Sequence, residues 1–404
     1  MFTYNNDKMN ELSSTIYSRI TDIAKVCLHE FRMIFKDEGV LIFVVLLPLF
    51  YPLLYSWIYN NEVVREVPVA VVDESHSEMS RKFTRAYDAT SDVKVAYQCD
   101  NMEEAKQLVA RQKAYGILYF PSDFSTTLNR MQQTHVSLYC NMGIMLTYKA
   151  LYQSATSVSS ALNAKIQVSV SPNYTSREDE INTRPLDFDE VPIFNNTGGY
   201  GNFILPGVLV LILQQVLLLG VGMSMGTSME EKRLQRISGM MAKPFGLGRI
   251  MIGRALALFG FFILIGVYVL LAIPKMFHFV HMLHGMDFAM FLVPYLLACI
   301  FFAYTFSFFV RQRENVMLLV VFTSVPFLFM SGVSWPQSNI PEFWKYVSYL
   351  IPSTFGIQGF VKMNTMGAVF SDIIPEVKAL WIQALLYFVA ACVTSRWQIK
   401  QCSE

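Results

Sequence analysis

Charged residues are spaced along the chain so that six long stretches contain no Asp, Glu, Lys or Arg. These uncharged, apolar stretches are Gly39–Asn61, Val191–Met229, Ala255–Pro274, Phe288–Val310, Asn315–Pro341 and Ala379–Ser395. A helix needs about 20 apolar residues to cross the hydrocarbon core of a bilayer, and the last stretch, with 17 residues, is at the lower limit. A soluble fold of this size has too little interior to bury six such helices. The pattern therefore predicts an α-helical membrane protein with six transmembrane helices.

Lys and Arg predict how these helices are oriented. One set of basic residues precedes the first stretch, lies between the second and third and between the fourth and fifth, and follows the last: Lys8, Arg19, Lys25, Arg32, Lys36, Lys232, Arg233, Arg236, Lys243, Arg249, Arg254, Arg311, Arg313, Arg396 and Lys400. The opposite short loops hold only Lys275, Lys345, Lys362 and Lys378. Because basic residues collect on the cytoplasmic side, we expect a multi-pass protein of the inner (cytoplasmic) membrane with both termini in the cytoplasm.

The region between the first two predicted spans has a different pattern and predicts an inserted mixed α/β extracytoplasmic domain. Four short runs rich in β-branched and aromatic residues are expected to be strands: Val67–Val72, Val93–Gln98, Tyr115–Phe120 and Val136–Cys140. Four segments between or after them are expected to be helices: Glu78–Ala89, Met102–Lys113, Ser125–Gln133 and Ile144–Val168. Alternation of strands and helices predicts βαβ units. The polar segment Ser171–Asp189 is expected to be a loop.

These patterns divide the chain into segments whose expected bounds can be stated. Transmembrane helices are expected at 39–61, 201–225, 250–274, 288–310, 315–334 and 378–395. The segments expected in the cytoplasm are 1–38, 226–249, 311–314 and 396–404. Those expected outside are the domain 62–200, the loop 275–287 and a segment with short helices, 335–377. Apolar residues at helical spacing within Ile16–Lys36 predict an amphipathic helix, which lies either in the membrane interface or against a partner or a neighbouring span.

Composition excludes several classes of protein. The chain is 53% hydrophobic and 16% charged with a net charge of +1, so it has no basic field that would attract nucleic acid. No G-x-x-x-x-G-K-[ST] phosphate loop occurs, and the cytoplasmic segments are too short to fold an ATPase. The six uncharged stretches also lack His, which argues against acid–base catalysis within the membrane. We therefore do not expect an enzyme, and we expect no cofactor in this chain.

Two segments resemble the permeases of ABC-2 type transporters. Phe194–Gly207, which ends in a Pro-Gly pair after an Asn-containing loop, is similar to the entry to that family's second span. Ser331–Phe360 is similar to the family's signature between its last two spans, and the matching positions are Ser331, Gly332, Pro336, Pro341, Trp344, Tyr349, Pro352, Thr354 and Gly359. The resemblance implies a permease that pairs with a second copy or a paralogue. It also implies a separate ABC ATPase subunit that binds ATP and Mg, and usually export.

The resemblance extends to the cytoplasmic segment between the second and third spans. Residues Glu230, Glu231, Arg233, Arg236 and Pro244 are similar to the charged segment that couples such permeases to their ATPase. This chain departs from the family pattern at Leu234–Arg236, where many relatives have a Gly-Thr pair. The arginines alone would also be explained by the orientation rule for basic residues, but that rule does not require the two glutamates.

Polar residues within the predicted spans are the candidate substrate path. Gln214 and Gln215 lie midway along the second span, and Thr323 and Ser324 lie in the fifth. A buried amide in lipid needs a partner, so each glutamine either lines a pore or forms a hydrogen bond between helices. Thr and Ser can instead bond their own helix backbone. Ser331, Gly332, Pro336, Pro341, Trp344 and Pro352 are candidates for an outer gate.

Two further groups of residues leave alternatives open. Cys99 and Cys140 both fall in the outer domain and would form a disulfide if the geometry allowed it in an oxidising compartment. His278, His281 and His284 are spaced three apart, so they are either a metal site or ordinary residues of the membrane boundary. We expect no metal.

The sequence as a whole predicts the permease subunit of an ATP-driven ABC exporter. Its apolar, aromatic spans favour a hydrophobic or amphipathic substrate, either drug-like or lipid-like, that leaves the cytoplasm or the inner leaflet. The expected partners are an ABC ATPase, a second permease copy, a periplasmic adaptor protein and the bilayer. The alternative is a membrane receptor or scaffold whose outer domain binds a ligand or an adaptor.

Overall fold

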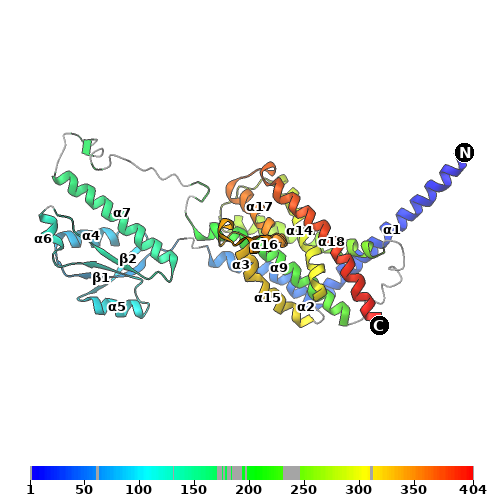
Figure 1. Cartoon of the computed structure of the whole chain (residues 1–404), viewed down its shortest axis with the longest axis horizontal. Coiled ribbons are helices and arrows are strands. Elements are labelled where there is room, and N and C mark those ends of the chain that lie inside the picture. The colour runs from blue at the N-terminus through cyan, green and yellow to red at the C-terminus, as the bar shows by residue number, and fades with distance from the viewer. Residues whose placement is uncertain are drawn as a thin grey trace. The chain divides into compact units, whose positions relative to one another are not determined.

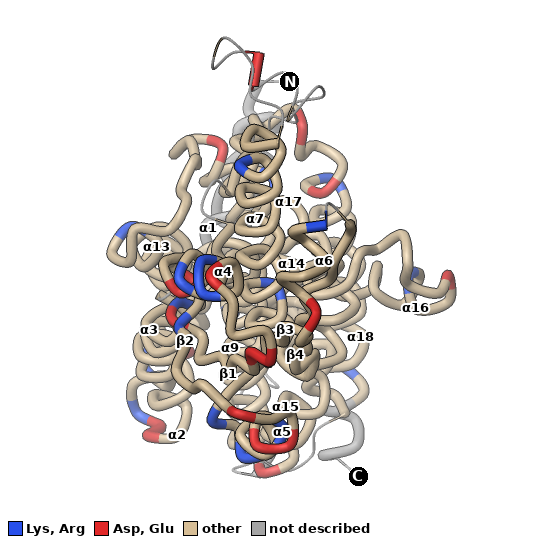
Figure 2. Tube along the Cα trace, turned by 90° about the vertical axis from the view of Figure 1, so that its left-hand side faces the viewer, with Lys and Arg blue, Asp and Glu red and all other residues tan. Residues whose placement is uncertain are grey.

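A computed structural model describes residues 2–60, 63–130, 132–170, 175, 178–179, 183, 193–195, 198–230, 246–309 and 313–403. The chain divides into two compact units. Met1–Glu62 together with Ile193–Glu404 form the helical unit, and Val63–Pro192 form the smaller unit. Figure 2 shows Lys, Arg, Asp and Glu on α4 and α5 of the smaller unit and around α2 and α16 of the helical unit.

The helical unit is built from long helices connected by short helical segments (Figure 1). Its helices are α1 Phe2–Lys36, α2 Glu38–Leu41, α3 Leu47–Ile58, α9 Tyr200–Glu230, α12 Gly246–Val267, α13 Ile273–Met276, α14 Gly285–Phe306, α15 Arg313–Met330, α16 Glu342–Ser348, α17 Pro352–Met366 and α18 Ile374–Ser403. The π-helical segments are η1 Ile42–Leu46 and η2 Tyr268–Ala272, and the 3-10 segments are η3 Ser307–Phe309, η4 Gln337–Asn339 and η5 Phe370–Ile373.

Among the described residues, five helices are long and apolar enough to cross a membrane. They are Glu38–Ile58, Tyr200–Ser228, Gly246–Met276, Gly285–Phe309 and Phe370–Trp397. The predicted span at 315–334 coincides with α15, whose apolar part Glu314–Met330 is shorter. At about 1.5 Å per residue this helix is about 25 Å long, shorter than the hydrocarbon core of about 30 Å. The protein is therefore a helical membrane protein, and the count of six spans stays a prediction.

Helix α9 is the centre of the helical unit. The most apolar stretch of this helix is 100% buried, whereas the corresponding stretches of the helices at Glu38–Ile58 and Phe370–Trp397 are each 28% buried. Close packing is possible because α9 carries glycines: a Cβ at Gly222 would lie 2.6 Å from Val316 Cγ1 of α15. Polar residues on α9 therefore face protein rather than lipid.

Two of the long helices widen into a π-helical turn immediately before a proline. Segment η1 ends two residues before Pro48, and η2 ends two residues before Pro274. Proline has no N–H and its ring collides with the carbonyl four residues earlier. A wider turn at that point accommodates the ring, so the helix continues across the proline.

The smaller unit is a four-stranded sheet with helices on both faces. Its elements are β1 Val67–Asp73, α4 Glu78–Asp88, β2 Val93–Cys99, α5 Met102–Ala110, β3 Gly116–Phe120, α6 Phe124–Asn129, β4 Ser137–Cys140 and α7 Met145–Val170. The strand order is β2-β1-β3-β4; β1 pairs in parallel with β2 and β3, and β4 is antiparallel to β3. Helices α4, α6 and α7 cover one face and α5 the other (Figure 1). The strands and helices lie where the residue pattern predicts them, and the βαβ expectation is confirmed.

A disulfide between Cys99 and Cys140 is excluded by the strand order. Cys99 ends β2 and Cys140 ends β4, which are the two opposite edges of the sheet. Neighbouring strands are about 4.8 Å apart, so two intervening strands separate the sulfurs by far more than a disulfide spans. Both cysteines are free thiols.

We predict that Cys99 and Cys140 remain reduced even when the protein is purified without reductant. Burial, and then the carboxylates of Glu104 and Asp100, raise the pKa of Cys99, and burial raises the pKa of Cys140. Both thiols should therefore react slowly with maleimide in the folded protein and fully after denaturation. Peptide mass spectrometry measures the labelling, and a cross-linked peptide pair joining the two residues would contradict the strand order.

Candidate functional site

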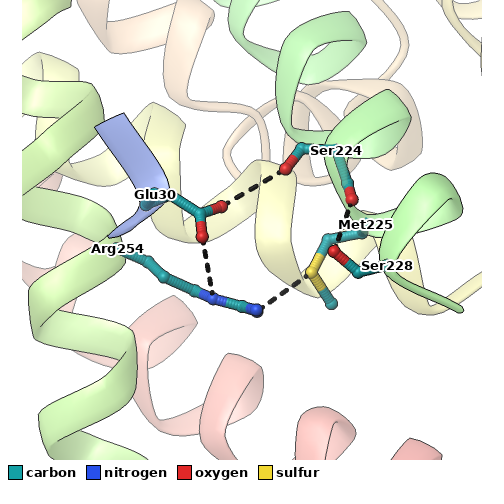
Figure 3. A network of polar contacts seen from close by, with 5 residues as sticks. All are labelled: Glu30, Ser224, Met225, Ser228 and Arg254. Atoms are coloured by element: carbon teal, nitrogen blue, oxygen red, sulfur yellow. Dashed lines mark hydrogen bonds and ion pairs between the residues drawn. The ribbon is translucent and has the colours of Figure 1, made fainter. Parts of the chain in front are cut away.

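A buried polar network joins three helices at one end of the bundle (Figure 3). Arg254 of α12 forms an ion pair with Glu30 of α1, with 3.4 Å between Nε and Oε2. Ser224 Oγ of α9 donates to the other carboxylate oxygen of Glu30 at 3.2 Å, and Arg254 Nη1 lies 3.2 Å from the sulfur of Met225. Glu30 is 7% exposed and Arg254 is 3% exposed. The two charges therefore neutralise each other out of contact with water.

Further contacts hold α1 against the same two helices. Asp22 of α1 pairs with Arg249 at 3.1 Å, and Thr227 Oγ1 of α9 donates to Asp37 at 3.0 Å. Gly253 lets α12 approach closely, because a Cβ there would lie 2.9 Å from the carbonyl oxygen of Ile23. Helix α1 therefore packs on a neighbouring span, which was one of the two alternatives for it.

The opposite side of α1 is apolar and uncovered. Ile20, Leu28, Phe31 and Phe35 are 60%, 57%, 44% and 50% exposed. An exposed apolar face of this kind is suited to the membrane interface, and the interfacial location of α1 stays a prediction.

Sequence reasoning missed the pair of Glu30 and Arg254, although a signal for it is present. Glu30 lies four residues from both Val26 and Ile34, which are buried. An acidic residue on the apolar side of an amphipathic helix has to meet a partner. Arg254, directly before an uncharged stretch, is the matching cation.

This network borders the predicted coupling segment. Helix α9 ends at Glu230 and α12 begins at Gly246, so the coupling segment connects α9 to α12. Glu231, Arg233, Arg236 and Pro244 lie outside the described residues. The coupling role of all five residues stays a prediction.

Gln214 and Gln215 are adjacent on α9 but have different surroundings. Gln214 is 1% exposed, and its Oε1 accepts a hydrogen bond of 2.6 Å from the backbone N–H of Ser353. Ser353 is the second residue of α17, so the amide oxygen of Gln214 caps the N-terminal turn of that helix. Of the two alternatives for this glutamine, the structure supports the bond between helices.

Gln215 points into an apolar pocket between α3, α9 and α15. The pocket has a volume of about 310 Å³, and its lining includes Tyr51, Tyr55, Val320, Val321, Ser324 and Leu328. Gln215 is 8% exposed, and neither Oε1 nor Nε2 has a hydrogen-bond partner among the described residues. A buried amide without partners costs free energy, on the order of 1–3 kcal/mol. A group that enters this pocket and bonds to Gln215 recovers that cost.

Thr323 and Ser324, the two hydroxyl residues of α15, also differ in their surroundings. Ser324 lines the same pocket as Gln215, whereas Thr323 does not line it. Both hydroxyls donate to their own helix, Thr323 to Leu319 O and Ser324 to Val321 O, each at 2.8 Å. The structure thus brings Gln215 and Ser324 together and leaves Gln214 and Thr323 outside the pocket.

The predicted outer-gate residues lie where α15 ends and two short helices follow. Ser331 is fully buried, and Gly332 adopts φ 91°, a conformation that favours glycine. Pro336 precedes η4, Pro341 precedes α16, and Pro352 begins α17. Trp344 of α16 is 51% exposed, and the role of these residues as an outer gate stays a prediction.

The three histidines do not form a cluster. Among the described residues, no group of three His, Cys, Asp or Glu side chains is placed to hold a metal ion. His281 Nδ1 lies 3.2 Å from Asn364 Oδ1 of α17, and burial lowers the pKa of His281. His281 therefore helps to fix the loop before α14 to α17.

The helical unit, with five described helices long and apolar enough to cross a membrane, defines a multi-pass membrane protein. Residues 39–393, most of the 404-residue chain, match the family model described as ABC-2 family transporter protein. The chain belongs to this family, whose members are membrane permease components of ABC transporters. No curated protein matches the chain.

We predict that the two glutamines differ in their effect on stability. Replacement Gln214→Leu leaves the Ser353 N–H without its acceptor and should lower the free energy of unfolding by about 1–3 kcal/mol. The matched variant Gln215→Leu removes an amide that has no partner among the described residues and should leave stability unchanged or raised. Thermal unfolding in detergent compares the two, and equal losses would contradict the assignment.

We also predict that the ion pair between Glu30 and Arg254 behaves as a buried pair. The single variant Glu30→Gln leaves the Arg254 guanidinium without a counter-charge and should lower the free energy of unfolding by about 3–5 kcal/mol. Adding Arg254→Met should restore most of that loss. The exposed pair of Lys82 and Glu78 on α4 is the control, since a solvent-exposed ion pair contributes little to stability. A Glu30→Gln variant no less stable than a Glu78→Gln variant would show that the network is dispensable.

Proposed function

We propose that the chain is the permease subunit of an ATP-driven ABC exporter for a hydrophobic or amphipathic substrate, drug-like or lipid-like. Membership of the ABC-2 family supports the general assignment. The observation that carries the substrate class is Gln215, an unpartnered amide in the pocket between α3, α9 and α15.

The lining of this pocket supports an uncharged amphiphile as cargo. It contains no Asp, Glu, Lys or Arg, and most of its residues are Leu, Val, Ile or Tyr. A volume of about 310 Å³ is at the lower end of the range for small-molecule sites, about 300–1,000 Å³. Apolar side chains bind the hydrocarbon part of a ligand, and Gln215 offers both donor and acceptor atoms for a hydroxyl, ester or amide group.

The pocket also suggests how such a molecule enters. Val321 and Val325, which line it from α15, are 63% and 57% exposed. In a membrane these side chains face lipid, so a substrate dissolved in the bilayer reaches Gln215 sideways, without crossing water. This supports uptake from within the bilayer rather than from the aqueous cytoplasm.

The source of energy in this proposal is a separate ATPase subunit that binds ATP and Mg and docks on the segment from Glu230 to Pro244. Force applied there reaches α9 and α12 together, because the buried pair of Glu30 and Arg254 and the bond from Ser224 hold their ends to α1. A movement of α9 against α15 then changes the pocket that these helices share. In this proposal the permease pairs with a second permease copy in the inner membrane, and both of its termini lie in the cytoplasm.

The test is transport by the complete complex in proteoliposomes. Replacement Gln215→Leu should lower transport of a neutral amphiphile and the ATP hydrolysis that it stimulates about 10-fold, the factor expected for one lost hydrogen bond of about 1.4 kcal/mol. Basal ATP hydrolysis should be unchanged, since the ATPase site is in another subunit.

The matched control is Val216→Leu, at a neighbouring position that also lines the pocket. This variant changes the volume of an apolar side chain without removing a polar group, so it should transport normally. Unchanged transport by Gln215→Leu would overturn the proposed site.

A further inference from the structure

The smaller unit contains a cavity of its own, of about 550 Å³. Phe83 of α4, Leu118 of β3 and Phe124 of α6 are buried residues that line it. One wall is α7, and the other is the segment 132–136 before β4. The volume is within the range of small-molecule sites, about 300–1,000 Å³.

The cavity exists because α7 extends past the core of its unit. Its buried residues end at Val158, and none of the residues from Ser159 to Val170 is buried. Leu162 and Ile166, one turn apart, nevertheless continue its apolar side and line the cavity. Apolar side chains beyond the core leave a surface that a ligand can cover.

The lining has no formal charge. It contains no Asp, Glu, Lys or Arg, and His135 is its only histidine. Uncharged hydrogen-bonding side chains border it on two sides: Gln132, Gln133 and Thr134 on one, and Thr156, Ser159, Ser160 and Asn163 of α7 on the other. A second cavity of the same unit is lined by Asp73, His76, Arg81, Arg85 and Asp100, so the absence of charge is specific to the first.

We propose that the cavity beside α7 binds an uncharged amphiphile. Its hydrocarbon part lies on Phe83, Leu118 and Phe124, and its hydroxyl or amide groups bond to the polar border at Gln133 and Ser159. A charged group would lose its hydration there without meeting a counter-charge, which disfavours ionised ligands. The chemistry matches the pocket at Gln215, and the identification of this ligand with the exported molecule rests on the proposed function.

The experiment uses the full-length chain in lipid nanodiscs and a photoreactive monoacylglycerol as the neutral probe. Peptide mapping after illumination should find label on α7 between Ala155 and Ile166 and on α4 near Phe83. Replacement Ser159→Trp fills the cavity and should lower this labelling about 10-fold. The matched control is Ser157→Trp, an exposed position on the same helix that does not line the cavity, which should be labelled like the wild type.

A second variant distinguishes loss of binding from misfolding and tests the role of charge. Ser159→Lys places a cation at the border, so labelling should shift from the monoacylglycerol to the fatty-acid anion of equal length. Equal labelling of the two tryptophan variants, or no label on α7 and α4 in the wild type, would overturn the proposal.

Failure of this inference and failure of the proposed function have different signatures. Gln215→Leu should reduce transport while α7 remains labelled. Loss of α7 labelling with transport still dependent on Gln215 would reject only the cavity of the smaller unit. Labelled α7 with transport independent of Gln215 would reject only the membrane pocket.

Discussion

The helical unit depends on the burial of α9, a helix without charge before its last residue, whose most apolar stretch is enclosed by other helices. Inside a bilayer, a polar side chain has to find its partner within the protein, because hydrocarbon offers none. Gln214 meets this requirement by capping α17, and Tyr295 of α14 adds a hydrogen bond of 2.7 Å to the carbonyl oxygen of Val210. These bonds fix α14 and α17 around α9, whereas neither polar atom of the Gln215 amide in the pocket has a partner among the described residues.

The two polar regions of α9 have complementary roles in this account. At its C-terminal end, Ser224 bonds to Glu30 of α1 and Thr227 bonds to Asp37, the residue after α1, beside the segment proposed to receive the ATPase. Midway along the helix, Gln215 faces the pocket shared with α3 and α15. Because α9 is a continuous helix from Tyr200 to Glu230, a displacement at its end is transmitted along its length. One rigid element therefore links the proposed site of force to the proposed site of cargo.

Local elements were predictable from sequence because their signals are local. Runs of β-branched and aromatic residues defined β1 and β2 closely, and uncharged stretches located the long helices but not their ends, because the helices continue past the charges or stop short of them. The relation between Cys99 and Cys140 was not predictable, since it depends on the order of strands in the sheet. Neither was the difference between Gln214 and Gln215, because two adjacent amides look alike until the neighbouring helices are placed. The burial of α17 was not predictable either, because its sequence is on average no more apolar than that of α18, whose most apolar stretch is only 28% buried.

Whether cargo binds beside Gln215 can be seen in a cryo-EM structure of the permease with its ATPase and a bound neutral amphiphile. We expect density for the ligand between α3, α9 and α15, with a polar atom within hydrogen-bond distance, about 3 Å, of the Gln215 amide. Ligand density elsewhere in the membrane region, with this pocket empty or closed by side chains, would contradict it.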